Sequence, residues 1–144
     1  MNELTAAPTR FITYWESLTL ATVQDLPAYY TADAYFRDPF NEVHGQAAIS
    51  RIFTEMFTRL EEPRFHIIET VSQPGSAFLI WDFMFRIKSF RPEVARTIHG
   101  TTHVRFAPDG RVSYHRDYWD AAAELYEHLP LIGGVLRFLR RRFA

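Results

Sequence analysis

The chain of 144 residues contains no cysteine. Disulfide bonds, thiolate catalysis and cysteine-based metal sites are therefore excluded. The chain also has no large excess of positive or negative charge, because its formal net charge is -1. Without a net positive field nothing draws the chain toward nucleic acid, and we expect no nucleic-acid partner.

Long hydrophobic runs are absent too. No stretch approaches the length of a membrane-spanning helix. Residues 1–10 lack the basic start and apolar run of a secretory signal, so we expect a cytoplasmic protein. The length suits one core, and we expect residues 1–144 to form a single domain.

Aromatic residues, by contrast, are abundant. They make up 16% of the chain, with 13 Phe, 7 Tyr and 3 Trp. This is more bulk than a minimal core needs, and it indicates a lined cavity or an apolar interface.

The spacing of apolar residues predicts helices in the first part of the chain. One is expected at 8–20, and a short one from about Thr22 or Asp25. After a short strand at 34–36, the clearest helix covers about 46–60. Its apolar stripe consists of Ile49, Ile52, Phe53, Met56, Phe57 and Leu60.

From residue 65 the pattern changes to a period of two. Strands are predicted at 65–71, 77–88, 94–106 and 112–119. The turns between them are short, which implies antiparallel pairing. Helices followed by a curved antiparallel sheet form an α+β layout.

The last part of the chain, about 121–144, is predicted to be a basic helical tail. A helix at 121–128 is interrupted by Pro130 and the glycines at 133–134, and a second helix follows at 135–143. One interpretation of its amphipathic pattern is contact with a membrane surface. We favour a helix that packs over a pocket mouth or a neighbouring subunit, because the run is short and the rest of the chain is not basic.

Two segments carry a family resemblance. Tyr35 to Phe40 contains an Asp-Pro pair, and His44 to Ile49 opens the longest predicted helix with Gly-x-x-x-Ile. Together with the order of elements over nearly the whole chain, they resemble the NTF2-like superfamily, and more narrowly its SnoaL-like and ketosteroid-isomerase-like branch. The segment His115 to Asp120 looks like the closing strand of SnoaL-like proteins. The resemblance implies a cone, in which a curved antiparallel sheet wraps around the N-terminal helices and encloses a pocket.

The resemblance also implies catalytic residues. Asp38 matches the general base of ketosteroid isomerases, and Tyr14 matches their oxyanion-binding tyrosine. Where those enzymes carry a second acid this chain has Thr102, which is a weaker hydrogen-bond donor to an oxyanion. The register of the family turns His115 and Asp117 into the pocket, where they suit a proton-transfer pair.

Each of these residues has a structural interpretation as well. Asp38 suits a turn in which its carboxylate accepts hydrogen bonds from local amides. Tyr14 suits an ordinary core position. Alternation alone places His115 and Asp117 on one face with Ser113, and without the family register that polar face would be the solvent face.

The resemblance further implies a small apolar ligand, contacted by Trp15, Phe53, Thr102 and Trp119. We expect acid/base isomerisation, cyclisation or dehydration of an apolar carbonyl compound. No organic cofactor is implied, and the histidines lack metal-ligand spacing, so we expect no metal. The alternative hypothesis is a non-catalytic ligand-binding or dimeric assembly protein on the same fold. Under both hypotheses the resemblance implies a homodimer through the outer sheet face, which carries Tyr114, Arg116 and Tyr118.

Overall fold

A computed structural model describes residues 3–124 and 132–143 of the chain. Helices come first, strands dominate the middle, and two helices close the described part. In chain order the elements are α1 (Glu3–Glu16), the 3-10 helix η1 (Thr22–Ala28), β1 (Tyr30–Arg37), β2 (Glu42–His44), α2 (Gln46–Arg59), β3 (Leu60–Gln73), β4 (Ser76–Ile87), β5 (Arg96–Phe106), β6 (Val112–Tyr118), α3 (Ala121–Glu124) and α4 (Ile132–Phe143).

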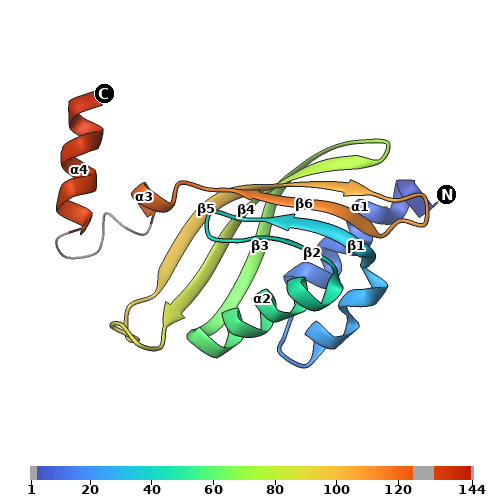
Figure 1. Ribbon diagram of the computed structural model, residues 1–144, viewed down its shortest axis with the longest axis horizontal. Coiled ribbons are helices and arrows are strands. Elements are labelled where there is room, and N and C mark those ends of the chain that lie inside the picture. The colour runs from blue at the N-terminus through green and yellow to red at the C-terminus, as the bar shows by residue number, and fades with distance from the viewer. Residues whose placement is uncertain (1–2, 125–131, 144) are drawn as a thin grey trace.

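The strands form one six-stranded sheet in the order β2-β1-β6-β5-β4-β3. Neighbouring strands are antiparallel except β1 and β6, which run parallel. Figure 1 shows the sheet curving, with α1 and α2 on the same side of it. The predicted α+β fold with a curved sheet around N-terminal helices is therefore confirmed.

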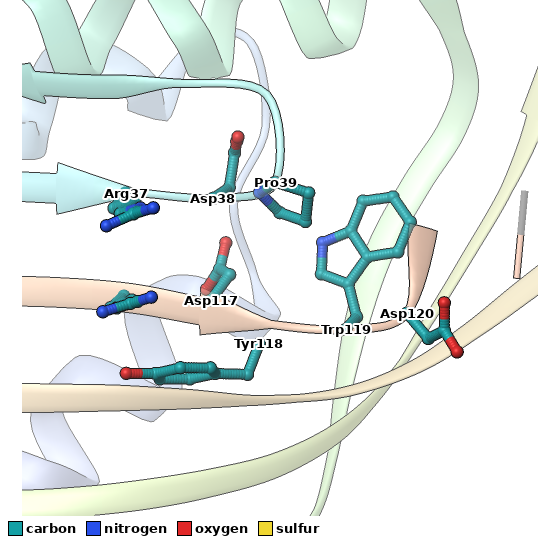
Figure 2. A pocket seen from close by; sticks show the side chains of 8 residues that line it. Arg37, Asp38, Pro39, Asp117, Tyr118, Trp119 and Asp120 are labelled. Atoms are coloured by element: carbon teal, nitrogen blue, oxygen red, sulfur yellow. The ribbon is translucent and has the colours of Figure 1, made fainter. Parts of the chain in front are cut away.

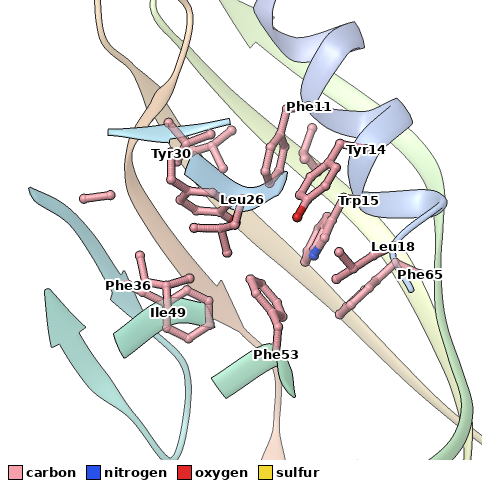
Figure 3. Close-up of a cluster of buried hydrophobic side chains, with 14 of the residues drawn as sticks. Phe11, Tyr14, Trp15, Leu18, Leu26, Tyr30, Phe36, Ile49, Phe53 and Phe65 are labelled. Atoms are coloured by element: carbon pink, nitrogen blue, oxygen red, sulfur yellow. The ribbon is translucent and has the colours of Figure 1, made fainter. Parts of the chain in front are cut away.

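The core lies between these helices and the concave face of the sheet. Helix α1 buries Ala7, Phe11, Tyr14 and Trp15, which recur at helical spacing. Figure 3 shows the aromatic side chains of α1 facing apolar side chains from η1, β1 and α2. The stacked rings of Trp15 and Phe65, with centroids 4.1 Å apart, join α1 to β3.

Two helices start earlier than the sequence predicted. Helix α1 begins at Glu3 and not at Pro8, because Leu4 and Ala7 extend its apolar face toward the N-terminus. Helix α4 begins at Ile132 and includes Gly133 and Gly134, so these glycines do not interrupt it as predicted. Pro130 and most of the helix predicted at 121–128 lie outside the described residues.

Two strands are longer than predicted. Strand β1 starts at Tyr30, four residues before the strand predicted at 34–36. Strand β3 starts at Leu60, directly after α2, and runs through Pro63. Because β3 is an edge strand, a proline can be accommodated there without removing a ladder hydrogen bond that the sheet needs.

Strand β6 contains a bulge that changes which side chains face inward. Arg105 pairs with Tyr114 and Phe106 with Val112, so Ser113 is the extra residue. As a result Val112 and His115 are both buried, although they are three residues apart. The strict alternation that grouped His115 with Ser113 is therefore wrong at this point.

Candidate functional site

A cavity of about 640 Å³ opens between the concave face of the sheet and α2. Its walls are mostly aromatic, with carboxylates and an amide near the ends of β1 and β6 and exposed polar side chains near the end of α2. Cavities of this size hold small organic molecules. The aromatic and aliphatic lining consists of Phe36, Phe40, Ile52, Phe53, Met56, Leu60, Phe65, Trp81, Phe83, Phe85, Ile87, Ile98 and Trp119, and the polar lining of Asp38, Asn41, Glu55, Thr58, Arg59, Lys88, Ser89 and Asp117.

Asp117 connects this cavity to a buried hydrogen-bond network. Its Oδ1 atom lies 2.5 Å from the Thr102 hydroxyl and 2.7 Å from Nε2 of His115. The side chain of Asp117 is only 11% exposed, while those of Thr102 and His115 are fully buried. Behind Thr102, the indole N–H of Trp81 donates to the Thr102 hydroxyl over 2.8 Å.

On the other side of the imidazole stands Tyr30. Its hydroxyl lies 2.9 Å from Nδ1 of His115, so both ring nitrogens of the histidine have partners. Burial raises the pKa of Tyr30 well above its usual value, and the negative charge of Asp117 raises it further. Tyr30 therefore stays a protonated hydrogen-bond donor.

The direction of each hydrogen bond follows from the donors available. The indole N–H of Trp81 can only donate, so the Thr102 hydroxyl accepts this hydrogen bond. The same hydroxyl donates a hydrogen bond to Asp117. The 2.5 Å separation lies within the range of an O–H···O hydrogen bond that this hydroxyl donates. His115 then donates from Nε2 to Asp117 and accepts at Nδ1 from Tyr30. Both hydrogen bonds to Asp117 end on Oδ1, and within the described part of the chain Oδ2 accepts none.

Asp38 lies at the end of β1, in the loop toward β2. Its Oδ1 atom accepts hydrogen bonds from the backbone N–H groups of Phe40 and Asn41, each over 2.7 Å, and from the Asn41 side chain. The turn interpretation of Asp38 therefore describes its local contacts. Burial raises the pKa of its carboxyl, and although these amide donors oppose the shift, the charge of Asp117 adds to it.

Asp38 and Asp117 come together because β1 and β6 are parallel neighbours. Arg37 pairs with Arg116, so the residue after each is an aspartate at the same end of the sheet. Both carboxylates line the cavity, and both line an adjoining hollow together with Trp119. Figure 2 shows the two aspartates on adjacent strands, with the Trp119 ring close to Pro39.

Of the other predicted site residues, Phe53 and Trp119 line the cavity. Tyr14, Trp15 and Thr102 do not, and they lie in the surrounding core. Tyr14 donates its hydroxyl proton to the Thr22 carbonyl over 2.9 Å and stacks on Tyr29. This places Tyr14 apart from the two aspartates, contrary to the arrangement expected from the resemblance.

Tyr30 and Trp81 are the members of the network that sequence reasoning missed. Tyr30 lies before the strand predicted at 34–36, and no motif in the sequence singles it out. Trp81 sits in a strand that is apolar on both faces in its first half, so nothing marked its N–H as a donor.

Comparison with known proteins agrees with the fold. The family model described as SnoaL-like domain matches residues 9–115. The chain belongs to the SnoaL-like domain family. The match begins within α1 and ends at His115 within β6, so it does not include Asp117. A comparison with curated proteins found no significant match.

Solved structures share the fold of this SnoaL-like domain at low sequence identity. An LEH-like epoxide hydrolase from M. tuberculosis superposes with a TM-score of 0.73 at 15% identity, covering 97% of this chain and 96% of that one. A proposed SnoaL-like polyketide cyclase from Shewanella putrefaciens gives 0.69 at 18% identity, covering 83% and 95%. A protein of ketosteroid isomerase-like fold from Catenulispora acidiphila, in complex with trimethylamine, gives 0.70 at 15% identity, covering 83% and 88%.

Two further properties concern the described part of the SnoaL-like chain. Within residues 3–124 and 132–143, no three His, Asp or Glu side chains are grouped so as to hold a metal ion. No helix in the same ranges is both long enough and apolar enough to cross a bilayer.

Proposed function

We propose that this SnoaL-like protein binds a small, largely apolar carbonyl compound in its cavity and moves a proton on the carbon next to the carbonyl. Isomerisation, cyclisation and dehydration all begin with such a step. The observation that carries the proposal is the position of Asp117, whose carboxylate faces the cavity on one side and the buried His115 and Tyr30 on the other.

In this proposal Asp117 is the base. Its Oδ2 atom takes the proton, and the electron pair of the broken C–H bond moves to the carbonyl oxygen as an enolate. Hydrogen bonds from Thr102 and His115 to Oδ1 hold the carboxylate in place. Positioned carboxylates of this kind commonly contribute about 10²–10⁴-fold to rate.

Asp38 is the complementary acid. Because its pKa is raised, the carboxyl keeps a proton to higher pH and can donate it to the enolate oxygen. The roles expected from the resemblance, with Asp38 as base and Tyr14 at the oxyanion, are thus redistributed. Asp38 lines the cavity and Tyr14 does not.

The test is deuterium incorporation from D₂O into a panel of apolar cyclic and linear ketones, followed by NMR. We expect exchange at the carbon next to the carbonyl, reduced by about 10²-fold or more in Asp117→Asn. The exposed Asp33 on β1 supplies the matched control, and Asp33→Asn should exchange at the wild-type rate. Equal exchange by wild type and Asp117→Asn would refute the role of Asp117.

A second candidate is ligand binding without turnover. It is favoured by the completeness of the network, because one chain of hydrogen bonds joins Trp81, Thr102, Asp117, His115 and Tyr30, and such a chain suits a rigid wall. Saturable binding of a ketone, seen as quenching of tryptophan fluorescence, combined with no exchange in any of the ketones, would select this candidate.

A further inference from the structure

The closing helix α4 separates an apolar side from a strongly basic one. At about 100° per residue, Val135, Leu136, Leu139 and Phe143 fall within one sector of roughly 100°. The arginines at 137, 140, 141 and 142 fall outside that sector. The helix contains no acidic residue.

The apolar side is not used within the described chain. Val135 is 59% exposed, Leu139 is 42% exposed and Phe143 is 85% exposed. None of the described residues that line the cavity belongs to α4, so the helix does not cover the cavity mouth, which was one of the two arrangements favoured from the sequence. Figure 1 shows α4 standing apart from the sheet, beyond α3.

Charge in this chain is segregated as well. Of its 16 basic side chains, four lie in the 12 residues of α4, and none of its 17 acidic side chains does. The rest of the chain is therefore net negative. A partner for α4 must accept apolar side chains and offer a dense array of negative charge at the same surface.

We propose that α4 binds the surface of an anionic lipid bilayer. The apolar sector would enter the boundary between headgroups and acyl chains, as amphipathic helices do. Arg140 and Arg142 flank that sector on its two sides, where their apolar stems reach along the helix and their guanidinium groups meet lipid phosphates. With a length of about 18 Å, the helix lies along the surface of a hydrocarbon layer that is about 30 Å thick.

The experiment uses the full chain and sedimentation with vesicles. Phosphatidylcholine vesicles that contain phosphatidylglycerol should bind the protein, pure phosphatidylcholine vesicles should bind it at least about tenfold more weakly, and added salt should release it. Arg141→Glu/Arg142→Glu should lower binding to the anionic vesicles by about tenfold or more. Leu139→Ala/Phe143→Ala, which truncates the apolar sector, should lower binding while leaving the charge unchanged.

A matched control changes the charge by the same amount elsewhere. Arg51 on α2 and Arg64 on β3 are both exposed, and Arg51→Glu/Arg64→Glu should bind vesicles like the wild type. No binding, equal binding to neutral vesicles, or equal loss in the control variant would each overturn the proposal. So would a result in which the α4 variants change only the oligomeric state, because α4 would then contact a second copy of the chain.

Discussion

The hydroxyl of Tyr30 and Nδ1 of His115 lie 2.9 Å apart, although 85 residues separate them in the chain. The contact exists because β1 and β6 are parallel neighbours, which places the start of β1 beside the start of β6. It fixes the imidazole with Nε2 toward Asp117. The orientation of a candidate catalytic carboxylate therefore depends on a tyrosine that does not line the cavity.

Removing the Tyr30 hydroxyl should therefore destabilise the fold. Tyr30→Phe keeps the ring but leaves Nδ1 of the fully buried His115 without a donor. An unsatisfied buried acceptor costs roughly 1–3 kcal/mol, and urea unfolding should show a loss of that size. Tyr29→Phe is the control, because the Tyr29 hydroxyl makes no hydrogen bond among the described residues, and it should leave stability within about 0.5 kcal/mol. Equal losses in the two variants would disprove the account.

Gly100 is required by the close approach of two tryptophans. A Cβ at this position would lie 2.5 Å from Cη2 of Trp81 and 3.0 Å from Cβ of Trp119. Trp81 is buried and bonded to Thr102, so it cannot move freely. Gly100→Ala should cost about 1–3 kcal/mol in urea unfolding and weaken ketone binding. Gly134→Ala, which meets nothing within 4 Å, should not destabilise the protein.

The pH dependence of stability should reveal the raised pKa of Asp38. The folded state favours the protonated carboxyl, so its contribution is present below the unfolded pKa of about 3.9 and is lost as pH rises through the higher folded value. Relative to Asp38→Asn, the wild type should thus lose stability as pH rises above about 4. Urea titrations across this range measure the difference.

In the same experiment, Asp109 should show the opposite dependence of stability on pH. The hydrogen bond from the Arg111 backbone N–H lowers the pKa of Asp109, and the Arg111 side chain lowers it further. Relative to Asp109→Asn, the wild type should lose stability only as pH falls. If the stability differences for Asp38→Asn and Asp109→Asn change with pH in the same direction, the raised pKa of Asp38 is contradicted.

The outer face of the sheet carries a continuous row of rings across five strands. Phe78 stacks on His103 at 4.5 Å, and His103 meets Tyr114 at 5.3 Å. Tyr114 stacks on Tyr35 at 5.1 Å, and Tyr35 meets His44 at 5.2 Å. Exposed aromatic surfaces of this kind are enriched at protein interfaces, which supports our proposal that the protein forms a homodimer through this face.

Sedimentation velocity tests the dimer. We expect the wild type to be dimeric and Phe78→Asp/Tyr118→Asp to be monomeric, because the change buries charge in the interface. Leu20 lies between α1 and η1 and is 57% exposed, so Leu20→Asp is a control that should remain dimeric. A monomeric wild type would contradict the proposal.

Local patterns were enough to predict most elements of this fold. The apolar stripe of residues 46–60 predicted α2 to within one residue, and short turns predicted the antiparallel order from β3 to β6. These signals are local, because helix periodicity and turn chemistry act over a few residues.

The position of the aspartates was only partly predictable. Asp38 and Asp117 were both chosen as candidates through the resemblance, whereas alternation alone turned Asp117 toward solvent. The bulge at Ser113 determines which face Asp117 occupies, because one extra residue reverses which side chains face the core on either side of it.

The helical and strand periods, the aromatic surplus and the basic tail follow from the sequence, since each depends on residues close together in the chain. Only the folded chain shows that Tyr30, and not Tyr14, reaches His115, and that Asp38 and Asp117 share one cavity. Both arrangements arise from the parallel pairing of β1 with β6, a contact between distant segments that no local pattern encodes.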